Sequence, residues 1–163
     1  MRTTQDQKVK LEEAGEHLVV SRLLANGYVA GRLPRTYKAN HIYVEHGMEV
    51  VHIQVKTRIG ARSWPVGTAV VADSPLRFYA FVLFPSLEPP DVDAPVVYVV
   101  PSATVRHAIE VEGKLYFATR PRQVEPGVPN IADPFRSKGI AEHGYGPGWL
   151  EQYRENWKLL EAP

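Results

Sequence analysis

The chain of 163 residues contains no cysteine, which excludes a disulfide framework, a thiolate metal site and a cysteine nucleophile. No apolar run approaches the roughly 20 residues that span a bilayer. The N-terminal stretch MRTTQDQKVKLEEAGEH is polar, whereas a signal peptide has an apolar core. We therefore expect a cytoplasmic protein that has no membrane partner.

Net charge is also small, at +1, so the molecule as a whole does not attract nucleic acid and any such footprint must be a local patch. The sequence has no internal repeats, no glycine-rich phosphate loop and no GxSxG or HExxH motif, which excludes several enzyme classes. The length fits one compact domain over residues 1–163.

Hydrophobic periodicity predicts a chain of alternating helices and strands. We expect a helix over 9–26, a short strand over 28–30, a hairpin within 40–58, buried strands over 77–84 and 96–100, and helices over 102–111 and 148–160. Loops are expected over 60–67 and 113–148. In the last helix, one face would carry Trp149, Tyr153, Trp157 and Leu160. This order of elements predicts an α/β sandwich with a mixed sheet.

The hairpin has a well-defined predicted register. Gly47-Met48 suits a two-residue type II′ turn, which requires glycine at its first position. One face then carries Ile42, Val44, Val51, Ile53 and Val55, and the other places His41 opposite Gln54, Tyr43 opposite His52, and Lys56 beyond Gln54. Polar groups are therefore expected to converge on one side, although a half-solvated sheet has a polar face without any function.

One carboxylate is unexpected in the first helix. Glu16 falls in the middle of the apolar side formed by Val9, Val19, Leu23 and their neighbours. A carboxylate at such a position needs a partner or access to water.

These features together resemble a known family. The pair Gly15-Glu16 followed by LVVSRLLANGY, and a hairpin that ends in IQVKT, are similar to the PD-(D/E)XK nuclease superfamily, particularly its Holliday-junction-resolvase-like and restriction-endonuclease-like members. The match covers residues 15–57. It implies an α/β fold with a restriction-endonuclease-like three-layer core, in which helices flank a mixed β-sheet.

The resemblance also implies the residues of an active site. Glu16, Gln54 and Lys56 would be catalytic, with Lys56 orienting the attacking water and stabilising charge on the phosphate. Glu16, His41 and Gln54 would bind a divalent metal, Mg²⁺ or Mn²⁺. The family has an aspartate where the register places His41, so only Glu16 would bring negative charge to the ion. An imidazole there favours Mn²⁺ or another transition ion.

Basic residues flank the hairpin at both ends. Arg32, Arg35, Tyr37 and Lys38 precede it, and Arg58, Arg62 and Trp64 follow it. Such residues hold phosphates and stack on bases in nucleic-acid-binding proteins, although surface loops collect arginine and lysine in any protein. The resemblance implies DNA as the partner and a homodimer as the assembly.

Two functions stay open at this point, beside a third alternative in which the IQVKT resemblance is accidental and the domain has nothing to do with nucleic acid. The first is a metal-dependent DNA endonuclease that hydrolyses phosphodiester bonds. The second is a nuclease-derived module that lost the chemistry and kept a DNA-binding or protein-interaction role, which the missing aspartate favours.

Overall fold

The structure is a computed structural model that describes residues 5–34, 36, 41–67, 74–85, 94–119 and 128–161. Its helices are α1 (Gln5–Ala25) and α2 (Ser102–Thr119). Its strands are β1 (Ala30–Arg32), β2 (Ile42–His46), β3 (Glu49–Ile59), β4 (Ser63–Pro65), β5 (Arg77–Phe84), β6 (Val96–Pro101) and β7 (Asn130–Ala132). Three 3-10 helices follow: η1 (Ile140–His143), η2 (Glu151–Tyr153) and η3 (Trp157–Glu161). The helix predicted over 102–111 extends to Thr119 as α2. The strands predicted over 28–30, 77–84 and 96–100 correspond to β1, β5 and β6.

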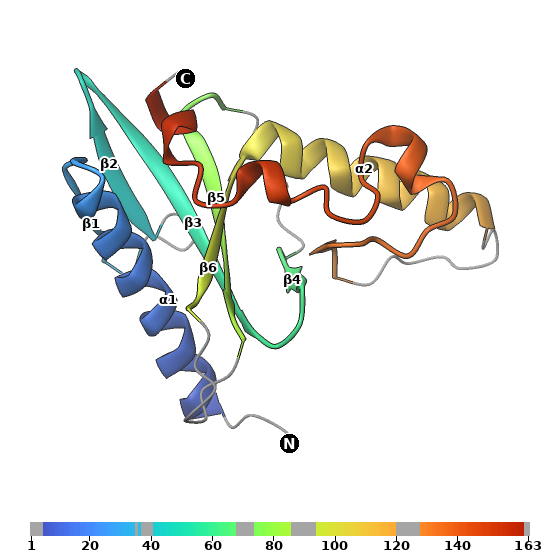
Figure 1. The fold of residues 1–163 in the computed structure, drawn as a ribbon, viewed down its shortest axis with the longest axis horizontal. Coiled ribbons are helices and arrows are strands. Elements are labelled where there is room, and N and C mark those ends of the chain that lie inside the picture. Colours follow the sequence, from blue (N-terminus) through green and yellow to red (C-terminus); the bar gives the residue numbers. More distant parts are fainter. Residues whose placement is uncertain are drawn as a thin grey trace.

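A mixed sheet of five strands organises the fold, in the order β1-β2-β3-β5-β6 (Figure 1). β3 and β5 are parallel, and the other neighbours are antiparallel. β4 and β7 form a separate two-stranded ribbon. The chain therefore has the predicted α/β class with a mixed sheet.

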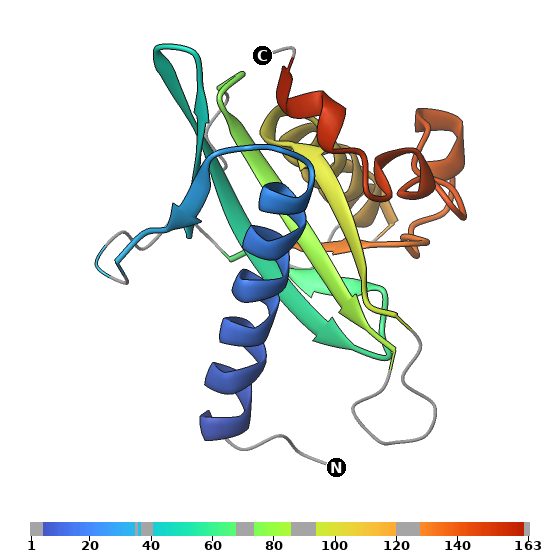
Figure 2. The same ribbon diagram turned by 60° about the vertical axis from the view of Figure 1, so that its left-hand side comes forward.

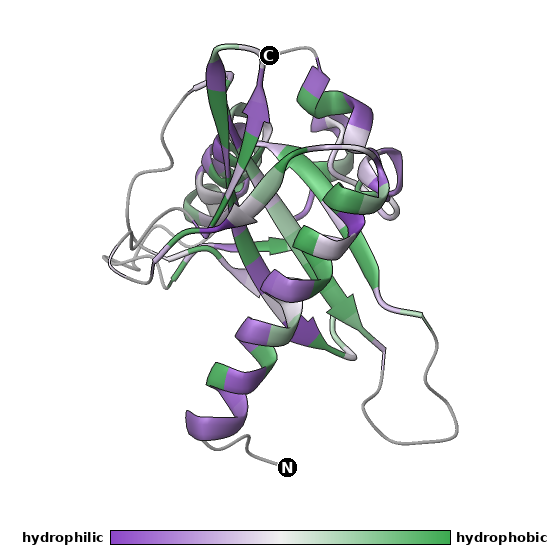
Figure 3. Ribbon diagram, turned by 90° about the vertical axis from the view of Figure 1, so that its left-hand side faces the viewer, coloured by the Kyte–Doolittle hydropathy of each residue, from purple (hydrophilic) through white to green (hydrophobic). Residues whose placement is uncertain are grey.

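The two faces of the sheet support two hydrophobic cores, because side chains alternate along each strand. On one face, Val19 and Leu23 of α1 pack against the strands. On the other face, Val105 and Ala108 of α2 pack with the β4–β7 ribbon. Figure 2 shows α1 in front of the sheet and α2 behind it, and Figure 3 shows mainly hydrophobic strands between them. None of the described helices is both long and apolar enough to cross a membrane.

The predicted hairpin register is confirmed for β2 and β3, where His46 pairs with Glu49 and Ile42 pairs with Ile53. Gly47 has a φ of 60°, in the left-handed region that the first position of a type II′ turn requires. The segment 60–67, predicted as a loop, includes β4. Trp64 of β4 is fully buried, and its indole N–H donates to the Val82 carbonyl at 3.0 Å.

The predicted helix over 148–160 is wrong. The segment forms η2 and η3, and its aromatic residues lie on opposite sides of the sheet: Trp149 packs in the core beside α2, whereas Trp157 packs in the core beside α1. The segment crosses the edge of β6 between them, where the Glu155 N–H donates to the Val97 carbonyl at 2.8 Å. The Glu155 carboxylate accepts the Val97 N–H at 3.2 Å. Helical spacing in the sequence therefore arose from residues that serve two different cores.

Gly15 allows α1 to lie directly on β3. A Cβ atom at this position would overlap the side chain of Thr57, well inside van der Waals contact. The residue that follows, Glu16, contacts Arg32 of β1 and His41, which precedes β2. The hydroxyl of Thr57 is buried without a hydrogen-bond partner in the structure.

We expect Gly15→Ala to destabilise the protein, because the added methyl group collides with Thr57. Gly113→Ala is the matched control: Gly113 also lies within a helix, but a Cβ there meets nothing within 4 Å. The control should gain about 0.5–1 kcal/mol from helix propensity, while Gly15→Ala should lose about 1–3 kcal/mol from overpacking. Urea unfolding measures both. Thr57→Ala should partly rescue Gly15→Ala, and a stabilising Gly15→Ala would contradict the close approach.

Candidate functional site

The carboxylate of Glu16 is held by an arginine. Glu16 Oε2 accepts a hydrogen bond from Arg32 Nε at 2.8 Å and forms an ion pair with Arg32 Nη2 at 2.6 Å. The pair is mostly shielded from solvent, with side-chain exposures of 16% for Glu16 and 29% for Arg32. This is the partner that a carboxylate on the packing side of α1 requires.

The sequence indicated Arg32 only as one of the basic residues flanking the hairpin that hold phosphates, and its pairing with Glu16 was missed. It lies in the basic stretch GRLPRTYKAN, and only the pairing of β1 with β2 brings it beside α1. Arg32 Nη1 also lies 2.9 Å from His17 Nε2. Because arginine only donates, His17 Nε2 is the acceptor in this contact.

His41 is placed differently from the prediction. β2 begins at Ile42, which pairs with Ile53. The preceding residue, His41, also donates its backbone N–H to the Ile53 carbonyl, at 3.1 Å. Two consecutive residues therefore lie opposite Ile53. This is the arrangement of a β-bulge. The expected pairing of His41 with Gln54 is therefore wrong. The bulge turns the imidazole toward α1, where His41 Nδ1 lies 3.6 Å from Glu16 Oε1.

The imidazole of His41 closes the edge of β3. Its Nδ1 accepts the backbone N–H of Val55 at 3.2 Å, so the neutral ring carries its proton on Nε2. Burial lowers the pKa of His41, and the negative charge of Glu16 opposes that effect. Neutral His41 is thus a backbone acceptor through one nitrogen and a donor through the other.

Lys56 lies within electrostatic range of Glu12 and His41. Burial lowers the pKa of Lys56, and the carboxylate of Glu12 on α1 opposes that effect. The charges of Lys56 and Glu12 also act on the pKa of His41. Lys56 nevertheless alternates with Val55, so its side chain leaves β3 from the face opposite α1.

Gln54 does not join Glu16 and His41. It alternates with Ile53 and Val55, whose side chains pack on the side of α1, so its own side chain starts from the opposite face. Among the described residues, Gln54 makes no hydrogen bond to Glu16 or to His41. The three predicted metal ligands are therefore not gathered into one set.

A divalent metal does not fit these residues. Glu16 is neutralised by Arg32, and His41 Nδ1 is engaged by a backbone N–H. Within the described residues, no group of three or more histidine, aspartate or glutamate side chains is arranged to hold a metal ion. Mg²⁺ and Mn²⁺ need several oxygen ligands with net negative charge, which this arrangement does not supply.

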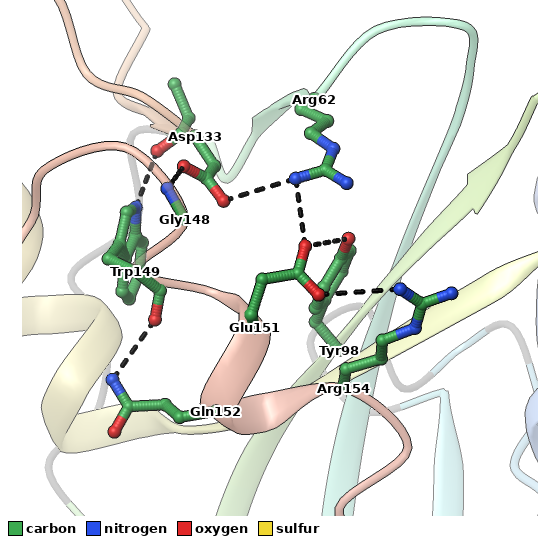
Figure 4. A network of polar contacts seen from close by, with 9 residues as sticks. Arg62, Tyr98, Asp133, Gly148, Trp149, Glu151, Gln152 and Arg154 are labelled. Atoms are coloured by element: carbon green, nitrogen blue, oxygen red, sulfur yellow. Dashed lines mark hydrogen bonds and ion pairs between the residues drawn. The ribbon is translucent and has the colours of Figure 1, made fainter.

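The predicted nucleic-acid-binding residues differ in their environments. Arg35 and Lys38 lie outside the described residues. Arg58 is exposed, and its Nε donates to the Ser63 carbonyl at 2.9 Å. Arg62 instead belongs to a polar network (Figure 4), where Arg62 Nη1 lies 3.0 Å from Glu151 Oε1 and 3.5 Å from Asp133 Oδ2.

This network attaches the C-terminal segment to the sheet. The Asp133 side chain is 1% exposed and accepts the Gly148 N–H at 2.6 Å. The Tyr98 hydroxyl of β6 donates to Glu151 Oε1 at 3.3 Å, and the Arg62 guanidinium lies over the Tyr98 ring. Arg62 therefore has a structural role, joining the β3–β4 connection to η2 and to the residue that follows β7.

Comparison of the chain with family models, with curated proteins and with solved structures finds no match. Inference about the function therefore depends on the sequence and structure of this chain alone.

We expect the Glu16–Arg32 pair to be strongly coupled. Removing one partner leaves a charge in a largely shielded place, so Arg32→Met and Glu16→Gln should each cost about 2–3 kcal/mol of unfolding free energy. The double variant should be at least about 1 kcal/mol more stable than additivity predicts. Urea unfolding of all four proteins measures this. The exposed pair Asp6–Lys10 is the control, and its coupling should stay within about 0.5 kcal/mol.

We also expect His41 to make the fold sensitive to acid. Its pKa is lowered in the folded state, so the unfolded chain takes up a proton first as pH falls below about 6.5. Wild-type stability should therefore fall between pH 7.5 and 5.5. His41→Asn keeps an oxygen acceptor for the Val55 N–H without titrating, so it should lose less stability over this range.

Urea unfolding at several pH values gives the comparison, with exposed His143 substituted by asparagine as the control. An unchanged pH dependence in His41→Asn would show that the ring is not held neutral by the fold.

Proposed function

We propose that this domain is a restriction-endonuclease-like module that binds DNA without hydrolysing it. The single observation that carries the proposal is the pairing of the Glu16 carboxylate with Arg32, through a hydrogen bond from Nε and an ion pair with Nη2. The only acidic ligand implied by the nuclease resemblance is thereby neutralised by the chain's own guanidinium. A hydrolase that depends on a divalent ion cannot use that carboxylate while Arg32 holds it.

The arrangement of the elements supports the family part of the proposal. α1 and α2 cover opposite faces of a mixed sheet, which is the architecture expected for a restriction-endonuclease-like core. The residues of the GE and QVK motifs also come near one another, since α1 packs on β3 and Lys56 feels the charge of Glu12.

The DNA part of the proposal rests on β3. Lys56 and Arg58 follow Gln54 at alternate positions of β3, so their side chains leave the strand from the same face, opposite α1. Arg58 is exposed, and its Nε bond to Ser63 sets the direction of the guanidinium. Phosphate contacts from lysine and arginine supply most of the affinity of non-specific DNA binding. The proposal places the protein in the cytoplasm, with access to DNA.

A metal-dependent DNA endonuclease is the second candidate, and one observation favours it. Lys56 keeps the strand position of the water-orienting lysine that the resemblance implies, and burial lowers its pKa. This candidate requires Arg32 to release Glu16 when Mg²⁺ or Mn²⁺ binds.

We expect duplex, nicked or branched DNA to bind in a salt-dependent manner and to stay intact in Mg²⁺ or Mn²⁺. Lys56→Ala and Arg58→Ala should each lower the slope of log K against log salt by about 1, because each removes one phosphate contact. Lys158→Ala is the control, since this exposed lysine lies on η3 at the β6 end of the sheet.

Fluorescence anisotropy measures binding and gel electrophoresis measures cleavage. Cleavage that disappears in Lys56→Ala would establish the endonuclease instead, and a lack of binding at low salt would remove DNA as the partner.

A further inference from the structure

We infer that Arg32 is the resident cation of this site: its guanidinium takes the place of a divalent metal beside Glu16 and keeps metal out. The inference deepens the proposed function, because it rests on the same site and names what replaced the ion.

The contacts of Arg32 account for the available ligand atoms. Its Nε donates to Glu16 Oε2, its Nη2 forms an ion pair with the same oxygen, and its Nη1 contacts His17 Nε2. The second oxygen of Glu16 lies 3.6 Å from His41 Nδ1. The carboxylate of Glu16 and the Nε2 atom of His17 are both suited to a divalent ion, and here they contact the guanidinium of Arg32.

The positive charge of Arg32 keeps a divalent ion from binding at Glu16. Arg32 is always protonated at accessible pH, so a divalent ion near Glu16 would meet a fixed positive charge at close range. The pair Arg32–Glu16 has no net charge left to attract such an ion. Metal binding therefore requires that Arg32 leave.

The planar fork of the guanidinium explains why arginine, and not lysine, suits this position. Two donors of one guanidinium meet one carboxylate oxygen, and a third reaches His17 from the same rigid plane. The remaining N–H groups of Arg32 keep a positive edge at the site without a bound ion.

The test is chemical rescue of a variant by Mn²⁺ alone, without nucleic acid. In Arg32→Met the carboxylate of Glu16 loses its counter-ion, and Mn²⁺ should restore part of the lost stability by binding it. Thermal unfolding followed by circular dichroism, after dialysis against EDTA, should show a Tm increase of about 2–5 °C at 10 mM Mn²⁺. Sodium chloride at matched ionic strength should not produce this increase.

Three proteins serve as matched controls. The wild type and Arg32→Lys keep a positive charge and should show no Mn²⁺ response, and Arg32→Met with Glu16→Gln lacks the carboxylate and should also show none. An Arg32→Met protein that does not respond overturns the inference.

A second measurement uses only the wild type and Glu16→Gln, in case Arg32→Met does not fold. Electron paramagnetic resonance of free Mn²⁺ should give the same titration for both proteins. Wild-type binding that is lost in Glu16→Gln overturns the inference, and equal titrations support it. Because no nucleic acid is present, these results are independent of whether the domain binds DNA.

Discussion

The ion pair between Glu16 and Arg32 links the first helix to the first strand, and the local geometry of the site follows from it. Gly15, the residue before Glu16, lets α1 lie on Thr57 of β3. Arg32 meets Glu16 from β1, which pairs with β2. His41 then lies against the second oxygen of Glu16 and completes the edge of β3 through the Val55 N–H. The contacts around the carboxylate of Glu16 therefore hold α1, β1, β3 and the bulge at His41 in place relative to one another.

The opposite side of the molecule is organised by a different set of polar contacts. Asp133 is almost completely buried, and its two oxygens meet Arg62 and the Gly148 N–H. Glu151 joins the same arginine to the Tyr98 hydroxyl. These contacts orient the segment that follows β7 so that Trp149 enters the core beside α2. The two polar centres therefore stabilise the two faces of the sheet separately.

Much of the fold could be predicted because it depends on local patterns. The alternation of apolar residues indicated β3, continuous apolar runs indicated β5 and β6, and Gly47 indicated the register of the hairpin. The C-terminal segment could not be predicted in this way. Its helical spacing was produced by Trp149 and Trp157, which pack in different cores. Periodicity does not reveal that a chain crosses a sheet edge between two apolar residues.

The candidate site was predicted in part. The motif indicated that α1 and the hairpin contribute to one site, and Glu16 and His41 do lie close together, but through the bulge and not through the predicted register. The pairing of Arg32 with Glu16 was missed because the two residues lie on different elements and meet only through the edge position of β1. The bulge at His41 was also missed, since a regular two-residue alternation gives no sign of an extra residue.

The crossing of the C-terminal segment over β6 has a consequence for how the chain reaches its native state. Every strand of the main sheet is synthesised before the residues around Glu155 that cover its last edge. Until those residues arrive, β6 exposes backbone groups that could pair with another chain. We therefore expect the nascent polypeptide to be most prone to intermolecular association, and most dependent on chaperones, between the completion of β6 and the arrival of that segment.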